Sequence, residues 1–291
     1  MPDFKFLENP FTHKWIVSAL KRSKRPDEGE HTLIPVCPFC RGREGEEEEL
    51  YRVGGRYPDM TWQVRVIPNK FAFAPVHEVI IHSQDHHKDF GESPLHQTEI
   101  VLQTYRQRFQ IHSGEGTVYL FHNHGEASGE SLPHPHSQLV VIPPYVSLEI
   151  PNLEISQGEL QETTHFTLFC PENSYWPDEV WVSPKKSSTT FGEITDTEIS
   201  DLAFVLQRLI DIMDLRHGHE FPFNFYISPW KNWYLRLIPR VRRLGGFEIG
   251  TNVSVNTQDS KETIAFIKEH FIDPNKEKIK AYRQAEYRKA V

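Results

Sequence analysis

Residues 129–142 read GESLPHPHSQLVVI, a polar stretch with two histidines that runs into four apolar residues. Pro143 and Pro144 follow directly after it. The apolar run and the prolines after it predict a β-strand. Successive side chains of an extended chain alternate between its two faces. His134, His136 and Gln138 would therefore point to the same side, and three polar groups would meet in one small volume.

The composition is that of an ordinary globular protein. The chain has 291 residues, 38% of them hydrophobic and 25% charged, which allows about two domains. A formal net charge of −8 argues against a general nucleic-acid binder, because such proteins are basic where they bind. The polar start MPDFKFLENP is no signal peptide, and no apolar run approaches the roughly 20 residues that cross a bilayer. We therefore expect a cytoplasmic protein that binds neither nucleic acid nor membranes.

Three cysteines are too few for a disulfide framework in a chain of this length. Two of them stand at the ends of Cys37-x-x-Cys40, a knuckle whose turn can bring two thiolates onto one cation. A redox pair and an incidental spacing are the alternatives to zinc. Two thiolates leave a tetrahedral site two ligands short. The candidates for the remaining ligands are His134 and one of the neighbours His86 and His87.

The chain contains an internal repeat. The segment that begins at His77 resembles the segment that begins at Asp178. The matched pairs are Glu78-Val79 with Glu179-Val180, and Phe90-Gly91-Glu92 with Phe191-Gly192-Glu193. Each copy predicts a strand, a loop and an amphipathic helix of about four turns, followed by two more strands. The sequence therefore predicts a tandem duplication of one strand-helix-strand unit.

The two copies differ where chemistry is expected. If Ile142 is aligned with Ile238, the two histidines and the glutamine have three other residues as counterparts: Trp230, Asn232 and Tyr234. The stretch that matches the cysteine knuckle, around Cys170, has lost its second thiol. We therefore expect one metal site and one reactive histidine per chain, both in the N-terminal half, and a buried, non-ligand role for Cys170.

Six motifs occur in a fixed order along the chain. They are Arg22-Ser-Lys-Arg25-Pro, Cys37-x-x-Cys40, Asn69-Lys-Phe71, Asp85-His86, Asn123 within Phe-His-Asn-His-Gly, and Ser131-Leu-Pro-His134-Pro-His136-Ser-Gln138. This set resembles the galactose-1-phosphate uridylyltransferase family, the two-repeat branch of the histidine-triad superfamily, which also contains ADP-glucose phosphorylases and diadenosine-tetraphosphate phosphorylases.

The resemblance implies an α+β fold of tandem duplicated histidine-triad-like units, in which an antiparallel sheet, a half-barrel, has flanking helices. It divides the chain into a catalytic repeat with the zinc site, residues 1–150, and a degenerate second repeat, residues 151–291. The second repeat would carry a hexose-binding loop and a C-terminal helix.

The resemblance also implies ligands and a nucleophile. One structural zinc ion per chain would be bound by four residues: Cys37, Cys40, His86 and His134. Held by the cation, His134 would aim His136 at a phosphorus atom. Attack of His136 on the α-phosphorus of a nucleoside-diphosphate sugar would expel the sugar 1-phosphate and leave a nucleotidyl-histidine. A second sugar phosphate, or inorganic phosphate, would then accept the nucleotide.

The remaining motif residues match positions that contact the nucleotide. Gln138 would donate a hydrogen bond to a phosphoryl oxygen but cannot act as an acid or base near neutrality, so that water is not activated and the reaction is a transfer. The family's nucleotide and phosphate contacts correspond here to Arg22, Arg25, Asn69, Phe71, Asn123 and Ser131. The forked donors of arginine suit phosphate. A solvated basic run is the alternative for the two arginines.

The second half offers one further motif, the loop Gly245-Gly246-Phe247-Glu248. It resembles the family's hexose-binding loop, in which a Glu accepts hydrogen bonds from sugar hydroxyls and reaches the active site of the neighbouring subunit. Gly246, Phe247 and Glu248 are therefore candidate substrate contacts in a homodimer with shared sites. A plain turn at the two glycines is the alternative.

The base of the nucleotide is not decided by these motifs. The His-Pro-His order favours uridylyl transfer between UDP-glucose and a hexose 1-phosphate, as in galactose metabolism. Ser137 and the Gly-Gly-Phe-Glu loop are closer to the ADP-glucose phosphorylase branch, which would transfer an adenylyl group to phosphate. A zinc-containing nucleotide-binding module without turnover is the third hypothesis, although a binder has no need of both His136 and Gln138.

Overall fold

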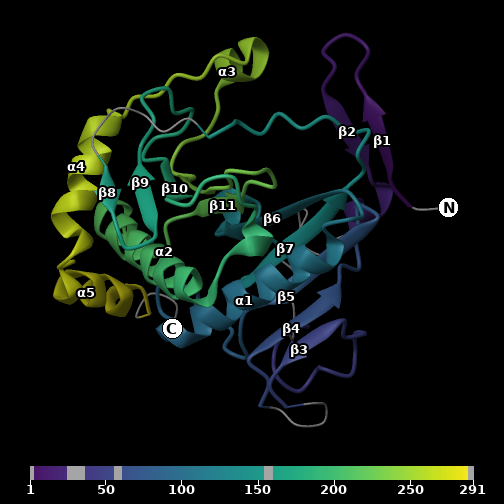
Figure 1. Ribbon diagram of the computed structural model, residues 1–291, viewed down its shortest axis with the longest axis horizontal. Helices are drawn as coiled ribbons and strands as arrows, with labels where there is room; N and C mark the ends of the chain where they lie inside the picture. The colour runs from purple at the N-terminus through teal and green to yellow at the C-terminus, as the bar shows by residue number, and fades with distance from the viewer. Residues whose placement is uncertain (1–2, 25–36, 56–60, 154–159, 288–291) are drawn as a thin grey trace.

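The centre of the molecule is one large antiparallel sheet (Figure 1). The computed structural model describes residues 3–24, 37–55, 61–153 and 160–287. Within these residues ten strands lie in the order β3-β4-β5-β7-β6-β11-β12-β10-β9-β8, and every neighbouring pair is antiparallel. The strands are β3 Tyr51–Val53, β4 Val64–Pro68, β5 Val76–Ile81, β6 Thr117–His124, β7 His136–Ile142, β8 Gln161–Glu162, β9 Phe166–Phe169, β10 Val180–Pro184, β11 Phe223–Ile227 and β12 Leu235–Pro239.

Two long helices cover one face of this sheet, and the smaller elements lie around its rim (Figure 1). The helices are α1 Leu95–His112, α2 Asp196–His217, α3 Gly246–Thr251, α4 Ser260–Phe271 and α5 Lys276–Tyr287. The short 3-10 helices are η1 Leu20–Lys24, η2 Glu126–Ser128 and η3 Phe191–Glu193. A separate hairpin is formed by β1 Lys5–Glu8 and β2 Trp15–Ser18. None of the helices in the described residues is long and apolar enough to cross a bilayer.

The main core lies between the two long helices and the sheet. On α1, Val101, Tyr105 and Phe109 are buried against the sheet at helical spacing. Helix α2 begins at a capping box, in which Thr195 accepts a hydrogen bond from the backbone N–H of Glu198 and the Glu198 carboxylate binds the Thr195 N–H. Both helices pack on the same face, so the opposite face of the sheet is left for the site.

The fold class predicted from the sequence is confirmed. The unit β5-α1-β6-β7 recurs as β10-α2-β11-β12, and the order of strands in the sheet is mirrored about the pair β6 and β11. In that pair Asn123 lies opposite Asn224. The two copies therefore share a single sheet. The division into domains at residue 150 stays a prediction.

The structure corrects the register of the repeat in the first strand of each copy. With Ile142 aligned to Ile238, Val140 corresponds to Arg236. Val140 lies opposite His77, and Arg236 lies opposite Trp181. His77 is therefore the counterpart of Trp181. The strand match expected from the sequence was three residues out of register, because the loop that follows β10 is shorter.

The faces of the two glutamates that the sequence had matched follow from this shift. An odd shift in a strand reverses the face to which a side chain points. Glu78 binds Arg108 of α1 at 2.8 Å, on the helix-covered face, whereas Glu179 binds Arg236 at 2.8 Å, on the opposite face. Their similar sequence context therefore hides two unrelated ion pairs.

Candidate active site and metal centre

A cleft opens on the face of the sheet that α1 and α2 leave uncovered. Strand β7 begins at His136, and its alternation turns His136 and Gln138 toward this cleft and Ser137 toward the helices. The residues that line the cleft are Pro38, Phe39, Glu47, Ile67, Pro68, Asn69, Lys70, Phe71, Val79, Ser131, Leu132, His136 and Gln138. Five residues expected at the nucleotide site meet here: Asn69, Phe71, Ser131, His136 and Gln138.

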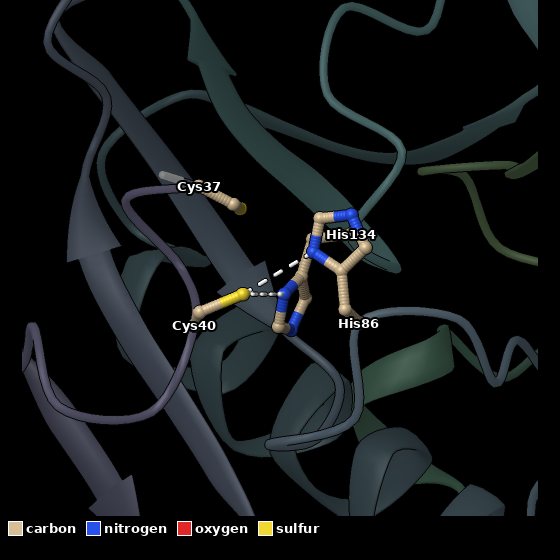
Figure 2. A group of neighbouring side chains, drawn as sticks. All are labelled: Cys37, Cys40, His86 and His134. Carbon is tan, nitrogen blue, oxygen red and sulfur yellow. Dashed lines mark hydrogen bonds between the residues drawn. The ribbon is translucent and has the colours of Figure 1, made fainter. Parts of the chain in front are cut away.

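The four predicted zinc ligands lie together beside this cleft (Figure 2). Their ligand atoms all lie within 4.8 Å of one another. The Cys40 Sγ is 3.2 Å from the His86 Nδ1 and 3.7 Å from the His134 Nδ1. Sulfur and nitrogen ligands of one tetrahedral zinc lie about 3.5 Å apart, given bonds of about 2.3 and 2.0 Å. The donor set and its spacing therefore fit zinc, and His86 rather than His87 belongs to this group.

Contacts around the metal centre orient its ligands. The His134 Nε2 lies 2.9 Å from the carbonyl oxygen of Ser83 and donates to it, so Nδ1 presents its lone pair to the centre. The Phe39 N–H donates to the Cys37 Sγ at 3.4 Å, as in a metal-binding knuckle. Burial raises the pKa of the Cys37 thiol to about 11. A cation is therefore needed to hold this thiol as a thiolate at neutral pH.

The His136 ring is held by the backbone carbonyl of His134, which lies two residues before it, just ahead of β7. Its Nδ1 donates to the carbonyl oxygen of His134 at 2.9 Å, which leaves the lone pair on Nε2. The side chain is buried, with 6% of the residue exposed, and it lines the cleft. Burial lowers the pKa of His136 to about 3. The ring of Phe39 lies 5.3 Å from that of His136 and 6.1 Å from that of His134, so the knuckle packs on both.

Gln138 is oriented by a residue that the sequence analysis missed. The His77 Nδ1 accepts the N–H of Phe73 at 3.3 Å, so a neutral His77 ring carries its proton on Nε2. That proton is donated to the Gln138 oxygen at 2.8 Å, and the Asn69 amide donates to the same oxygen at 3.3 Å. The Gln138 oxygen is therefore occupied, and its NH₂ group is the end left for a ligand. No motif flagged His77, because a lone histidine in a strand has no signature.

The polar groups of the cleft wall are held by short local contacts. The Asn69 oxygen accepts the N–H of Phe71 at 2.9 Å and so shapes the turn after β4. Arg22 donates to the Phe71 carbonyl at 3.0 Å, and its guanidinium lies over the ring of Phe73 at 4.8 Å. Arg22 thus lies behind the wall and is not among its lining residues. Arg25 falls outside the described residues. Lys70, between two motif residues, brings a further cation to the cleft.

Asn123 lies on β6, two residues beyond Phe121, which pairs with Gln138. Asn123 and Gln138 therefore lie on the same face of the sheet. The Asn123 oxygen accepts a hydrogen bond from Asn224 at 2.7 Å, which fixes its amide. Asn123 is not among the residues that line the cleft.

The candidate hexose loop lies apart from the cleft. Helix α3 carries Gly246, Phe247 and Glu248 and projects from the body of the molecule, far from β5 and β7 (Figure 1). None of the three lines the cleft of the same chain. Glu248 binds Arg242 and the N–H of Gly245 instead, and Phe247 is 56% exposed. One chain does not bring this loop to His136.

The duplicated antiparallel sheet carries a Cys₂His₂ group beside a buried, oriented histidine. This combination resembles the two-repeat histidine-triad-like proteins, as the motifs predicted. No family model matches the chain. Among curated proteins, ADP-glucose phosphorylase of Arabidopsis thaliana is 26% identical over 86% of this chain and 88% of its own. Galactose-1-phosphate uridylyltransferase of Thermotoga maritima is 28% identical over 76% of this chain and 80% of its own.

Solved structures agree in fold. The chain superposes on an ADP-glucose phosphorylase from Arabidopsis thaliana with a TM-score of 0.70 and 23% identity, over 93% of this chain and all of that one. A structure of a uridylyltransferase gives a TM-score of 0.72 with 22% identity, over 91% and 97% of the two chains. The resemblance predicted from the motifs is thus confirmed, and the chain is a nucleotidyltransferase of the branch that holds these two enzymes.

Proposed function

We propose that the chain moves a nucleoside monophosphate between a nucleoside-diphosphate hexose and a hexose 1-phosphate through a covalent nucleotidyl-histidine on His136. The reaction would be of the UDP-glucose–hexose-1-phosphate uridylyltransferase type. One observation carries the proposal: the His136 Nδ1 is held by the His134 carbonyl at 2.9 Å while the ring lines the cleft. An imidazole fixed in this way has one nucleophilic nitrogen, Nε2, at the reaction site.

The chemistry follows in two displacements. The lone pair of the His136 Nε2 attacks the α-phosphorus, and the bond from that phosphorus to the bridging oxygen breaks, so that the sugar 1-phosphate leaves with the electron pair. The ring then carries a positive charge, which the His134 carbonyl stabilises through the Nδ1–H. A phosphate oxygen of the acceptor attacks the same phosphorus and releases His136 as the neutral ring.

The neighbours of His136 favour transfer over hydrolysis. The NH₂ group of Gln138 would donate to a non-bridging phosphoryl oxygen, because His77 and Asn69 occupy its oxygen. An amide cannot take a proton from water near neutrality. Zinc at the Cys₂His₂ centre would have four protein ligands and no open position, which assigns it a structural role. The zinc ion would hold His134 in place and, through the His134 carbonyl, would also hold His136.

A second candidate is adenylyl transfer from ADP-glucose to phosphate. The relative named ADP-glucose phosphorylase aligns over 86% of this chain, whereas the uridylyltransferase of Thermotoga maritima aligns over 76% at similar identity. The apolar wall of Phe39, Ile67 and Phe71 would pack against either base.

The proposal includes a homodimer in the cytoplasm. Helix α3 projects from the body with Phe247 and Ile249 exposed by 56% and 73%. Helix α3 also carries the carboxylate of Glu248, and it is distant from the cleft of its own chain. These features suit a role in the cleft of a second copy. An isologous dimer would contain two equal sites of this kind.

Mass spectrometry of the intact protein tests the function. The protein is mixed with UDP-glucose or with ADP-glucose in the absence of an acceptor. We expect a covalent adduct of one nucleoside monophosphate with one of the two, lost on addition of hexose 1-phosphate or phosphate. His136→Asn is the matched control, since the second repeat has Asn232 at this position, and it should show no adduct. Binding of both sugars without an adduct on the wild type would leave the nucleotide-binding module as the correct reading.

A further inference from the structure

A second group of histidines lies on the other face of the same strands. Strand β6 alternates, so His122 and His124 point to the helix-covered side while Asn123 points to the opposite side. Asp89, in the loop between β5 and α1, reaches both rings. Its Oδ2 is 2.9 Å from the His124 Nδ1 and 3.3 Å from the His122 Nε2. The ligand atoms of the three residues lie within 4.8 Å of one another.

The hydrogen bonds of His122 leave a lone pair facing a carboxylate. The His122 Nδ1 lies 3.0 Å from the backbone carbonyl oxygen of His136. A carbonyl only accepts, so Nδ1 carries the proton, and the Nε2 of the neutral ring is an acceptor. This acceptor faces the Asp89 Oδ2, which is an acceptor too. Two acceptors at 3.3 Å need a proton or a metal ion between them.

The surroundings of Asp89 contain unused ligand atoms. Among the described residues, the Asp89 Oδ1 and the His82 Nδ1 are both buried without a hydrogen-bond partner, and they lie 3.9 Å apart. His82 is 3% exposed, and its other nitrogen contacts the Ser137 hydroxyl at 2.8 Å. A buried donor or acceptor without a partner costs free energy, because it has given up its hydrogen bonds to water. Such a cost beside three ligand atoms points to a missing ligand.

The distances within the group suit one cation. Neighbouring nitrogen and oxygen ligands bound at about 2.0–2.2 Å lie about 2.8–3.6 Å apart in octahedral or tetrahedral geometry. The separations of 2.9 and 3.3 Å fall in this range. Two imidazoles and one carboxylate are a donor set for divalent transition metals such as zinc or iron(II). A hollow that is lined by Asp89, His124, His219 and Glu220 reaches the group and provides an entry path.

We propose that Asp89, His122 and His124 bind a second divalent transition-metal ion, distinct from the zinc of the Cys₂His₂ centre. The sequence predicted one metal per chain, and this site would add another in the same half. Because His122 donates to the carbonyl of His136, the ion would sit directly behind the strand that carries the nucleophile. It would stabilise the neutral His122 tautomer that this hydrogen bond requires.

Metal stoichiometry tests the second site. The purified full-length protein is stripped of metal, reloaded with Zn²⁺ and passed through a desalting column, and the zinc retained per chain is measured. We expect two equivalents for the wild type, and one each for Asp89→Asn and for the double variant Cys37→Ser, Cys40→Ser. Asp89→Asn keeps the shape of the side chain and should weaken the second site by about 100-fold or more, beyond the effect of losing an outer contact.

Asp178→Asn is the matched control. Asp178 is also buried and contacts a single histidine, the His217 Nε2 at 3.1 Å, together with Arg216. This variant should retain both equivalents. One equivalent in the wild type, unchanged in Asp89→Asn and lost with the two cysteines, would overturn the proposal and leave a buried ion pair in which the His122 ring carries a second proton.

A spectroscopic measurement covers the case in which Asp89→Asn fails to fold. Wild-type protein that holds one zinc per chain is titrated with Co²⁺ and its absorption is recorded. The second site contains no sulfur, so we expect one equivalent of cobalt to bind with d–d bands and without thiolate-to-cobalt charge transfer. If cobalt binds only by displacing zinc, with charge-transfer bands, the second site does not exist.

Discussion

At one place in the N-terminal half of the sheet, His77 donates a hydrogen bond to Gln138 at 2.8 Å. At the corresponding place in the C-terminal half, the rings of Trp181 and Tyr234 stack with centroids 4.1 Å apart. The strands and their pairing are the same in both halves. Gln138 lines the cleft of the first half, whereas Trp181 and Tyr234 pack in an apolar cluster at the corresponding place of the second half.

The comparison separates scaffold from chemistry. Each half supplies a helix and three strands that pack into the common core. The reactive positions are few and lie on the open face, where a polar pair can be exchanged for an aromatic pair without loss of packing. The predictions that follow test whether function resides in the N-terminal positions and stability in both halves.

The largest expected effect is that of His136→Ala. Removing the nucleophile should lower the rate of nucleotidyl transfer by at least about 1000-fold. Zinc content and the melting temperature should stay near wild type, because the ring of His136 is not a ligand of the Cys₂His₂ centre. Steady-state kinetics, elemental analysis and thermal unfolding provide the three readouts. Normal turnover in this variant would contradict the mechanism.

His134→Ala should act in the opposite order. Loss of one ligand from a closed Cys₂His₂ centre should release zinc and lower the free energy of unfolding by about 3 kcal/mol or more. Activity should fall as a consequence, since His136 is bound to the backbone of His134. Zinc content and denaturant unfolding are measured together.

The two neighbouring histidines provide the control for the metal centre. His86→Ala should lose the same zinc equivalent as His134→Ala, and His87→Ala should keep it, because His86 and not His87 belongs to the Cys₂His₂ group. A loss confined to His87→Ala would overturn the ligand assignment.

A smaller effect is expected for His77→Leu. The Gln138 oxygen then keeps only the donor from Asn69 at 3.3 Å, so its amide is held less firmly. We expect kcat to fall by about tenfold while KM changes less. His77→Gln supplies an amide donor at the same position and should restore part of the loss. The kinetics are compared at saturating substrate.

Tyr234→Phe is the counterpart in the second half. It removes the hydrogen bond from the Tyr234 hydroxyl to the Pro151 carbonyl, 2.6 Å long, and keeps the stacked ring. Stability should fall by about 1 kcal/mol with kcat unchanged. Equal losses of kcat in His77→Leu and Tyr234→Phe would contradict a difference in role between the halves.

Complementation tests whether one active site combines His136 of one chain with Glu248 of a second chain. His136→Ala and Glu248→Ala chains, each nearly inactive alone, are mixed under conditions that allow subunit exchange. Half of the dimers should then be mixed, with one intact site of two, so about a quarter of wild-type activity should return. No recovery despite demonstrated exchange would mean that each chain builds its site alone.

The repeat and the strand pairs after each helix were predictable because each depends on a local pattern. The resemblance of the motifs, and no local pattern, pointed to Asn69, Phe71 and Ser131. The Cys37-x-x-Cys40 spacing and the alternation through His136 place side chains by covalent geometry alone. The register between the copies was not predictable, since a loop that is three residues shorter changes no local signal. His77 and Asp89 were missed for a similar reason: Asp89 meets His122 from 33 residues away, and only the folded sheet brings them together.

The pairing of β6 with β11 has a consequence for how the chain can be divided. The two halves meet through five residue pairs, from His124 with Phe223 to Leu120 with Ile227. A half expressed alone would expose the backbone N–H and C=O groups of this strand along an open edge, which invites pairing with other chains. We therefore expect each half to protect the other from aggregation, whether or not the second repeat contacts a substrate.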